Sequence, residues 1–119
     1  MTNHRKAERF KAVTFTTVYD HNMDVILGFL GDLTLSGALI IGEKLLERNQ
    51  EIILRMEFSE ASDLPDKTFV VPAHIAWCQE QEDGIYIHTG VEFKDITPQT
   101  KNIIATVLEK YNFDDNITL

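Results

Sequence analysis

Two short motifs contain the side chains best suited to binding an anionic ligand. Residues 5–9, RKAER, place two guanidinium groups four residues apart. Residues 32–37, DLTLSG, combine a carboxylate, a hydroxyl and a glycine directly before an apolar run. A guanidinium matches a phosphate or the O6 and N7 acceptors of guanine, and a carboxylate can accept from the donor edge of that base. Together the motifs predict a clamp for a planar, anionic ligand, which points to a nucleotide second messenger rather than to a substrate that is turned over.

Each motif also has a simpler interpretation. Arg5 and Arg9 could belong to a solvated basic arm that contacts nothing. Asp32 and Thr34 could bond the backbone of their own turn, while Gly37 supplies a positive φ. Both interpretations of the turn can hold at once, and the presence of the two motifs in one chain favours the ligand role.

The composition is that of one globular domain with an uneven charge. The chain has 119 residues, of which 44% are hydrophobic and 25% charged. Its net charge of −8 argues against binding DNA or RNA through a basic surface. Residues 1–11 contain four basic residues and one acidic residue, whereas the remainder contains 7 Lys and Arg against 18 Asp and Glu. Such a cationic arm could trap an anion, or it could fold back onto the acidic surface of the protein itself.

Several other classes of protein find no support in the sequence. No apolar run is long enough to cross a bilayer, and the N-terminus leads into no apolar stretch typical of a secretory signal. Cys78 is the single cysteine, so no internal disulfide can form and a reducing cytoplasm is the simplest compartment. His74 and His88 have no partners at metal-ligand spacing, and we expect no metal and no cofactor. No nucleophile, base or metal set indicates an enzyme.

Alternation and turn residues predict a chain of short strands followed by one helix. Strands are expected at residues 10–19, 23–33, 38–41, 51–58, 69–79 and 85–93. Turns are expected at 20–22, 32–37 and 80–84, and loops at 43–49 (with partial helix) and 59–67. Pro72 indicates an edge or a bulge within its strand. Thr97 and Pro98 open a helix. The apolar face of that helix comprises Ile103, Ile104, Val107, Leu108 and Tyr111.

This order of elements predicts an all-β dominated fold, in which a small antiparallel barrel is capped at one end by the helix. Closing the sheet removes the exposed edges that such short strands would otherwise present. The chain divides into a flexible ligand-binding arm at residues 1–10, a barrel with its helix at 11–112, and a tail at 113–119.

The order of these features resembles the PilZ domain, the bacterial receptor module for cyclic di-GMP. The matching stretches are RKAER at 5–9, DLTLSG at 32–37, HIAW at 74–77 and HTGVEF at 88–93, followed by the terminal helix. Each stretch is weak alone, but their order and spacing make the combination specific. The resemblance implies a six-stranded antiparallel β-barrel of the PilZ type, a split barrel, with one C-terminal α-helix.

The resemblance also implies roles for individual residues. Arg5 and Arg9 would bind guanine and phosphate, while Asp32, Thr34 and Gly37 would form the other wall of the site. Thr34 stands where the family pattern usually has serine, so the hydroxyl is kept and a methyl group is added.

Four further residues are possible secondary contacts of the ligand: His4, Lys6, Ser36 and Trp77. His4 lies at a position that in the family influences whether one nucleotide or a stacked pair is bound, which leaves the stoichiometry open. Trp77 could offer a flat apolar surface near the ligand. A lone tryptophan in a strand is more often part of the core, and we favour the core for Trp77.

The function implied by the resemblance is that of a cyclic di-GMP receptor that changes conformation on binding and signals to a partner protein, which the sequence does not identify. The alternative is a protein adaptor of the same fold that binds no nucleotide. The presence of both arginines counts against the adaptor.

Overall fold

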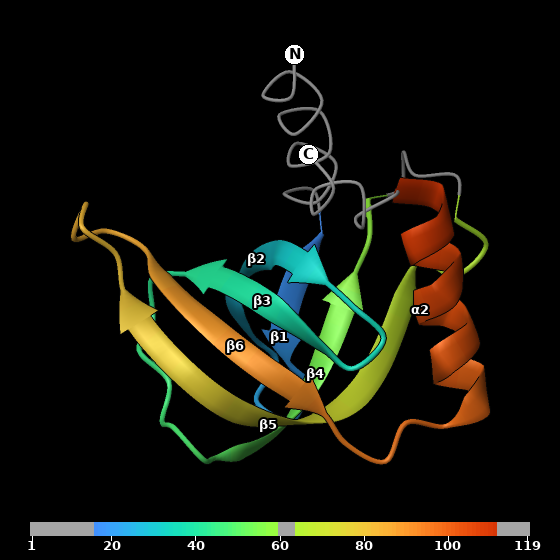
Figure 1. Cartoon of the computed structure of the whole chain (residues 1–119), viewed down its shortest axis with the longest axis horizontal. Coiled ribbons are helices and arrows are strands. Elements are labelled where there is room, and N and C mark those ends of the chain that lie inside the picture. Colours follow the sequence, from blue (N-terminus) through green and yellow to red (C-terminus); the bar gives the residue numbers. More distant parts are fainter. Residues whose placement is uncertain (1–15, 60–63, 112–119) are drawn as a thin grey trace.

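The computed structural model describes residues 16–59 and 64–111, which form a closed antiparallel barrel with a helix beside it (Figure 1). The strands are β1 (Thr17–Asp20), β2 (Val25–Leu33), β3 (Gly37–Gly42), β4 (Glu51–Glu57), β5 (Thr68–Glu80) and β6 (Ile87–Phe93), and the helix is α2 (Pro98–Tyr111). Around the barrel the strands follow the order β1-β2-β3-β6-β5-β4, and β1 pairs with β4 to close it. The six-stranded barrel and the C-terminal helix confirm the predicted fold class.

Two of the local predictions need correction. The turn expected at 32–37 is confined to residues 34–36, because Asp32 and Leu33 belong to β2, as the strand expected at 23–33 already had it, and Gly37 belongs to β3. The segment 43–49 is a loop that contains no helix. The first strand was expected from residue 10, but residues 10–15 lie outside the described part, and β1 begins at Thr17.

Pro72 lies inside β5, where it pairs with Ile53 of β4. Its carbonyl accepts a hydrogen bond from Lys94 N (2.8 Å), so this face of the residue points towards the β6 side. Because N and O of one strand residue point the same way, the missing N–H of Pro72 also faces that side, where the β5–β6 ladder ends at Ala73 and Phe93. Pro72 lies opposite Lys94 and cannot return a hydrogen bond to the Lys94 carbonyl, so the β5–β6 ladder ends at this point and Pro72 stands at a local edge.

Two β-bulges decide which side chains face outwards at the end of β2 and in the second half of β5, while a further shift against β1 leaves Leu27 extra in the first half of β2. The β2–β3 register shifts between Leu30 and Asp32, so Gly31 is an extra residue in β2. The β5–β6 register shifts between Ile75 and Trp77, so Ala76 is an extra residue in β5. Since side chains alternate between the two faces of a sheet, one extra residue reverses the alternation beyond it.

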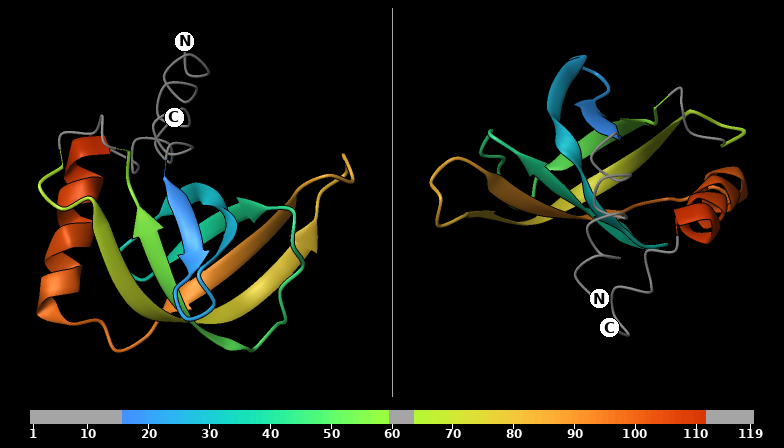
Figure 2. Two further views of the ribbon diagram at one scale, coloured as in Figure 1. Left: turned by 180° about the vertical axis from the view of Figure 1, so that it is seen from behind. Right: turned by 90° about the horizontal axis from the view of Figure 1, so that it is seen from above.

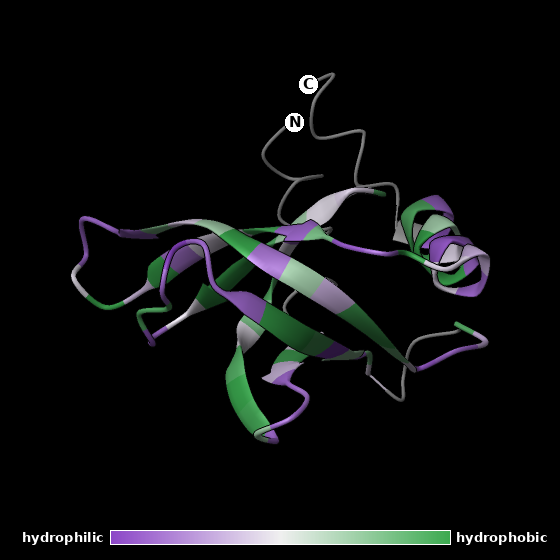
Figure 3. Ribbon diagram, turned by 90° about the horizontal axis from the view of Figure 1, so that it is seen from below, coloured by the Kyte–Doolittle hydropathy of each residue, from purple (hydrophilic) through white to green (hydrophobic). Residues whose placement is uncertain are grey.

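The core fills the inside of the barrel and extends under the helix. Leu30, Leu33, Leu54 and Ile75 are among its fully buried members. Figure 3 shows the resulting alternation of hydrophobic and hydrophilic residues along the strands. Among the described residues, no helix is long and apolar enough to cross a membrane.

The helix α2 begins as the sequence predicts. The Thr97 hydroxyl accepts a hydrogen bond from Thr100 N at 3.1 Å, which is the N-cap contact, and Pro98 follows as the first helical residue. Figure 2 shows α2 standing beside the start of β5 in both views. Ile104 and Val107 enter the core, and Ile103 and Leu108 pack against it. The helix is therefore held by its apolar face rather than by helix propensity alone.

The β5–β6 turn projects beyond the barrel and is ordered by one carboxylate. Asp83 Oδ1 accepts hydrogen bonds from Ile85 N (2.8 Å) and Tyr86 N (3.1 Å), and Gly84 has a positive φ of 70°. These two backbone donors lower the pKa of Asp83 from its ordinary value of 3.8, with a smaller contribution from His88. The predicted hairpin signal Asp83-Gly84 thus lies in the turn that joins the two strands.

Truncating the helix anchor should destabilise the whole domain. We expect Ile104→Ala to lower the free energy of unfolding by about 2–5 kcal/mol, because it removes a fully buried side chain and leaves a cavity. Urea unfolding followed by circular dichroism measures the change. The control Lys101→Ala alters an exposed residue of the same helix and should leave the midpoint nearly unchanged. Equal midpoints for wild type and Ile104→Ala would show that the helix does not contribute to the core.

The Asp83 carboxylate should make the stability of the domain depend on acid pH. A carboxyl group whose pKa is lowered in the folded state stabilises that state above its ordinary pKa, near 3.8, and this stabilisation is lost as the pH falls through the folded value. We expect wild type to exceed Asp83→Asn in urea midpoint at pH 6 and the two to converge below about pH 3. Glu82→Gln is the neighbouring control. A difference that does not change with pH would contradict the assignment.

Candidate ligand-binding site

One row of residues runs across four strands on the outer face of the barrel. Asp32 of β2 pairs with Leu39 of β3, Leu39 pairs with Gly90 of β6, and Gly90 pairs with Trp77 of β5. Both bulges lie at the ends of this row. Because each bulge reverses the alternation of its strand, Asp32 and Trp77 face outwards while Leu30 and Ile75 point into the core.

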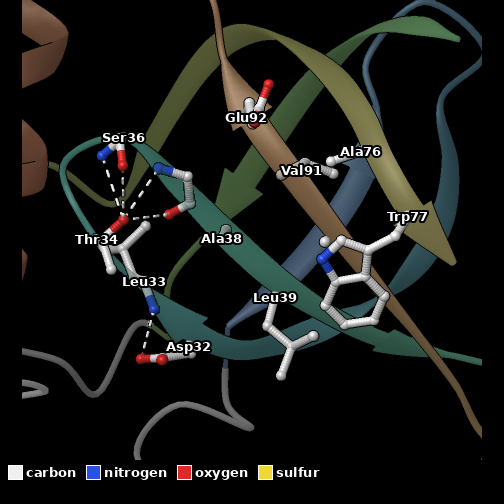
Figure 4. A pocket seen from close by; sticks show the side chains of 12 residues that line it. Asp32, Leu33, Thr34, Ser36, Ala38, Leu39, Ala76, Trp77, Val91 and Glu92 are labelled. Carbon is white, nitrogen blue, oxygen red and sulfur yellow. Dashed lines mark hydrogen bonds between the residues drawn. The ribbon is translucent and has the colours of Figure 1, made fainter. Parts of the chain in front are cut away.

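A pocket of about 340 Å³ lies over this row (Figure 4). Its lining comes from the end of β2, the following turn, β3, β5 and β6. The residues are Asp32, Leu33, Thr34, Ser36, Gly37, Ala38, Leu39, Ala76, Trp77, Gly90, Val91 and Glu92. Five residues singled out from the sequence, namely Asp32, Thr34, Ser36, Gly37 and Trp77, are thus brought together in one place.

Trp77 forms one wall of the pocket, and its placement in the core was wrong. Its side chain is 42% exposed, and Figure 4 shows the indole lying across β6 towards Leu39. A Cβ atom on Gly90 would lie 2.2 Å from the indole Nε1. The absence of a side chain at Gly90 therefore creates the space in which the ring lies flat on the sheet.

The Thr34 hydroxyl organises the turn between β2 and β3. Its Oγ1 accepts hydrogen bonds from Gly37 N (3.1 Å) and Ser36 N (3.2 Å) and lies 3.3 Å from Gly37 O, to which it can donate. The turn interpretation is therefore right for Thr34. Serine could make the same bonds, so threonine in place of the usual serine leaves the turn intact.

Gly37 does not adopt the positive φ that the turn interpretation required. It pairs with Glu92 of β6, and a Cβ atom at Gly37 would lie 2.3 Å from Val91 O. Glycine at this position therefore allows β3 and β6 to approach closely, which is a packing requirement.

Asp32 presents a carboxylate at the edge of the pocket. Its Oδ1 accepts a hydrogen bond from Leu33 N at 2.9 Å. Within residues 16–59 and 64–111, Oδ2 has no hydrogen-bond partner, so this oxygen can accept from a ligand. The only other acidic side chain of the lining is Glu92, and the lining contains no basic residue.

The predicted contacts His4, Arg5, Lys6 and Arg9 lie outside the described residues. The described chain begins at Thr16, whose carbonyl accepts a hydrogen bond from Leu30 N at 3.0 Å. Because β1 is antiparallel to β2, the described chain begins near the Asp32 end of β2.

Other side chains considered from the sequence do not converge on a site. His74 Nδ1 lies 2.8 Å from Glu51 Oε2, whereas His88 lies in a different row of the sheet. The Cys78 thiol lies 3.2 Å from the hydroxyl of buried Thr89. Among the described residues, no group of three or more His, Cys, Asp or Glu side chains could hold a metal ion.

Sequence reasoning missed Leu39, Gly90 and Glu92 as parts of the pocket. Gly90 carried a signal, since a glycine inside a strand indicates a bulge or a close approach of another group. The pairing of Gly90 with Trp77 depends on the bulge at Ala76, which has no distinctive sequence.

The geometry describes a small barrel with a shallow, acidic-edged pocket on its outer face, as suits a ligand-binding module. The family model of the PilZ domain matches residues 3–110. The chain belongs to the PilZ domain family.

Solved structures share the fold at low sequence identity. One is YcgR from Escherichia coli in complex with c-di-GMP, with a TM-score of 0.63 and 11% identity over 87% of this chain. The chain spans only 43% of the length of that protein. The PilZ domain of the same YcgR with c-di-GMP gives a TM-score of 0.62 and 10% identity, covering 87% of this chain and 85% of the domain. No curated protein sequence matched the chain.

Adding a methyl group beneath the indole should displace it. We expect Gly90→Ala to shift the emission of Trp77 to longer wavelength and to increase its quenching by acrylamide, because the new Cβ would lie 2.2 Å from Nε1. Trp77 is the only tryptophan, so the emission reports on this ring alone. Gly84→Ala strains the β5–β6 turn because Gly84 has a positive φ, but it brings no atom within 4 Å, so it controls for destabilisation and should leave the emission unchanged. Unchanged spectra for Gly90→Ala would contradict the stacked geometry.

Proposed function

We propose that this protein is a cyclic di-GMP receptor that binds the nucleotide between its N-terminal arm and the outer face of the barrel. The observation that supports this most is the pocket that combines Asp32, Thr34 and Gly37 with Trp77. Membership of the PilZ domain family and the likeness to YcgR, solved with c-di-GMP, add to it.

The pocket offers chemistry suited to a guanine base. The exposed indole of Trp77 provides a flat apolar surface for stacking. The Asp32 carboxylate can accept from the N1–H and N2–H₂ donors of guanine. At about 340 Å³ the pocket is at the small end of the range for ligand sites, so it takes part of a dinucleotide and leaves the remainder to be covered.

The phosphates require charge that the described pocket does not supply. Its lining contains two carboxylates and no basic side chain, whereas Arg5 and Arg9 precede Thr16 on the arm. The seven residue-to-residue steps from Arg9 to Thr16 can span roughly 25 Å at full extension. The arm therefore has the length to bring both guanidinium groups over the pocket, where they would bind phosphate and guanine.

Binding would convert arm position into a signal. A cationic arm that closes on an anionic ligand loses conformational entropy. The ligand would offset this loss and so shift the arm from open to closed conformations. We assign no chemical step to the protein. Its output is the altered surface shown to a partner protein, and its place of action is the cytoplasm.

Loss of either arginine should weaken binding without affecting folding. We expect Arg5→Ala and Arg9→Ala each to cost about 1.5–3 kcal/mol of binding free energy, the worth of a hydrogen bond to a charged group. This corresponds to roughly 10- to 150-fold in Kd. Isothermal titration with cyclic di-GMP measures it, with GTP as the ligand control, and the melting temperatures should stay within a degree or two of wild type.

A control variant outside the pocket and a variant of the pocket residue Asp32 make the test specific. Arg48→Ala removes an exposed arginine that does not line the pocket and should bind as wild type does. Asp32→Asn keeps the size of the side chain and should weaken binding, and ligand binding should quench Trp77 emission. Wild-type protein that gives no heat with cyclic di-GMP would favour the adaptor that binds no nucleotide.

A further inference from the structure

A second hollow lies on the same outer face, at the end where the β5–β6 turn projects. Its volume is about 530 Å³, and its walls come from the first half of β2, the end of β3 with the two residues that follow it, and Tyr86, which directly precedes β6. The apolar walls are Ile26, Phe29, Ile41 and Tyr86. The rings of Phe29 and Tyr86 meet edge to face with centroids 6.3 Å apart, so the projecting turn is fixed against β2. We call this hollow the hairpin groove.

The hairpin groove exposes more apolar surface than the barrel needs. Ile26 is 60% exposed in the wall of the groove, and Leu45 and Ile85, which adjoin lining residues in sequence, are 64% and 58% exposed. Ile41 is buried but belongs to no part of the inner core, because it lies on the outer face. Clustered exposed side chains of this kind mark sites of protein association. Figure 3 shows the start of β2 as a hydrophobic stretch that stands out from the barrel.

The rim of the groove is mainly acidic. Glu43 lines it, and the Asp83 carboxylate accepts a hydrogen bond from the backbone N–H of the lining residue Tyr86, with exposed Glu82 beside it. Lys44 is the basic residue of the lining. The rim therefore favours a partner that carries positive charge around an apolar face.

The closed sheet limits how a partner can bind. Every described strand has a hydrogen-bonded neighbour on each side, and stretches that pair on one side only, such as Val25–Gly28 of β2 and Trp77–Glu80 of β5, are short. The barrel therefore offers only short edges for the addition of a further strand. A second copy of the chain would bring like-charged rims together, and residues 1–11 contain few apolar side chains that could fill the groove. An amphipathic helix, with apolar side chains on one face and Lys or Arg beside them, satisfies both the groove and its rim.

We infer that the hairpin groove is the docking site for a basic amphipathic helix of a partner protein. Ile26 and Tyr86 are its anchoring walls, and the carboxylates of the rim select positive charge. The groove is separate from the pocket over Asp32 and Trp77, so occupation of one does not block the other.

A synthetic helix tests the inference. The probe is a fluorescein-labelled peptide of about five helical turns, with leucine on one face and lysine on the other. Its controls are a scrambled peptide of equal composition and a peptide with glutamate in place of every lysine. Fluorescence anisotropy measures affinity, and amide chemical shifts in the nitrogen-15-labelled full chain locate the contact. We expect only the lysine helix to bind, with shifts centred on Ile26, Phe29 and Tyr86.

Two variants distinguish binding at the groove from non-specific hydrophobic binding. Ile26→Asp should weaken the lysine helix about tenfold or more, as loss of an anchor does. Val70→Asp changes an apolar residue of 39% exposure on β5, outside the groove, and should bind the helix as wild type does. Both variants should keep the wild-type circular dichroism spectrum. Binding of all three peptides alike, shifts elsewhere, or dissociation of a dimer by Ile26→Asp would overturn the inference.

The outcome is independent of nucleotide binding. Ile26→Asp should titrate with cyclic di-GMP as wild type does, because Ile26 does not line the pocket over Trp77. Loss of the peptide with intact nucleotide binding supports the groove. Failure of wild type to bind nucleotide, with the peptide still bound at the groove, would refute the proposed receptor function and leave the docking site standing.

Discussion

The surface that carries the candidate site depends on one constraint, the alternation of side chains along β2 and β5 and its reversal at two bulges. Leu30 and Leu33 both enter the core although they are three residues apart, because Gly31 is extra. Asp32 is thereby placed outside. Without the extra residue its carboxylate would share the inner face with Leu30, at the cost of removing a charge from water. The bulge at Ala76 does the same for Trp77.

The electrostatics of the pocket favour the proposal that the arm takes part in binding an anion. Asp32 and Glu92 give the described lining a negative charge, which repels phosphate. A dianionic ligand is then favoured only when cations arrive with it, and the positive charge of this acidic chain is concentrated at residues 1–11. The barrel alone would recognise the guanine base, and the arm would supply affinity for phosphate. Under the proposed function, this division would couple ligand binding to the position of the arm.

The fold followed from the sequence because its signals are local. Turn residues such as Asp83 and Gly84, the cap Thr97 and the apolar stripe through Ile104 each specify an element without reference to the rest of the chain. The outward position of Trp77 could not be predicted in this way. It depends on which residue of β5 is left unpaired against β6, and that is decided by the fit of both strands to a closed barrel.

For the same reason, only part of the candidate site could be predicted from the sequence. Asp32, Thr34 and Gly37 were found because they form a motif, yet Gly37 proves to be required by the approach of β6 rather than by its own turn. Leu39 and Gly90 belong to no motif. They contribute to the pocket because they lie next to each other on β3 and β6, two strands that are distant in sequence. A pattern in one segment cannot report on such a neighbour until the register is known.

The barrel itself is poorly suited to transmit a signal by deformation. Its strands are paired on both sides around a packed core, and packed cores resist gradual change. The outer face offers another route. A Cβ atom at Gly31 would touch the side chains of both Leu39 and Ile41, so the wall of the pocket and the wall of the hairpin groove adjoin one another. A ligand that covers Leu39 would change the surface beside Ile41 without moving a strand. Any such coupling must act equally in both directions, since a partner that favours the closed arm also tightens the ligand.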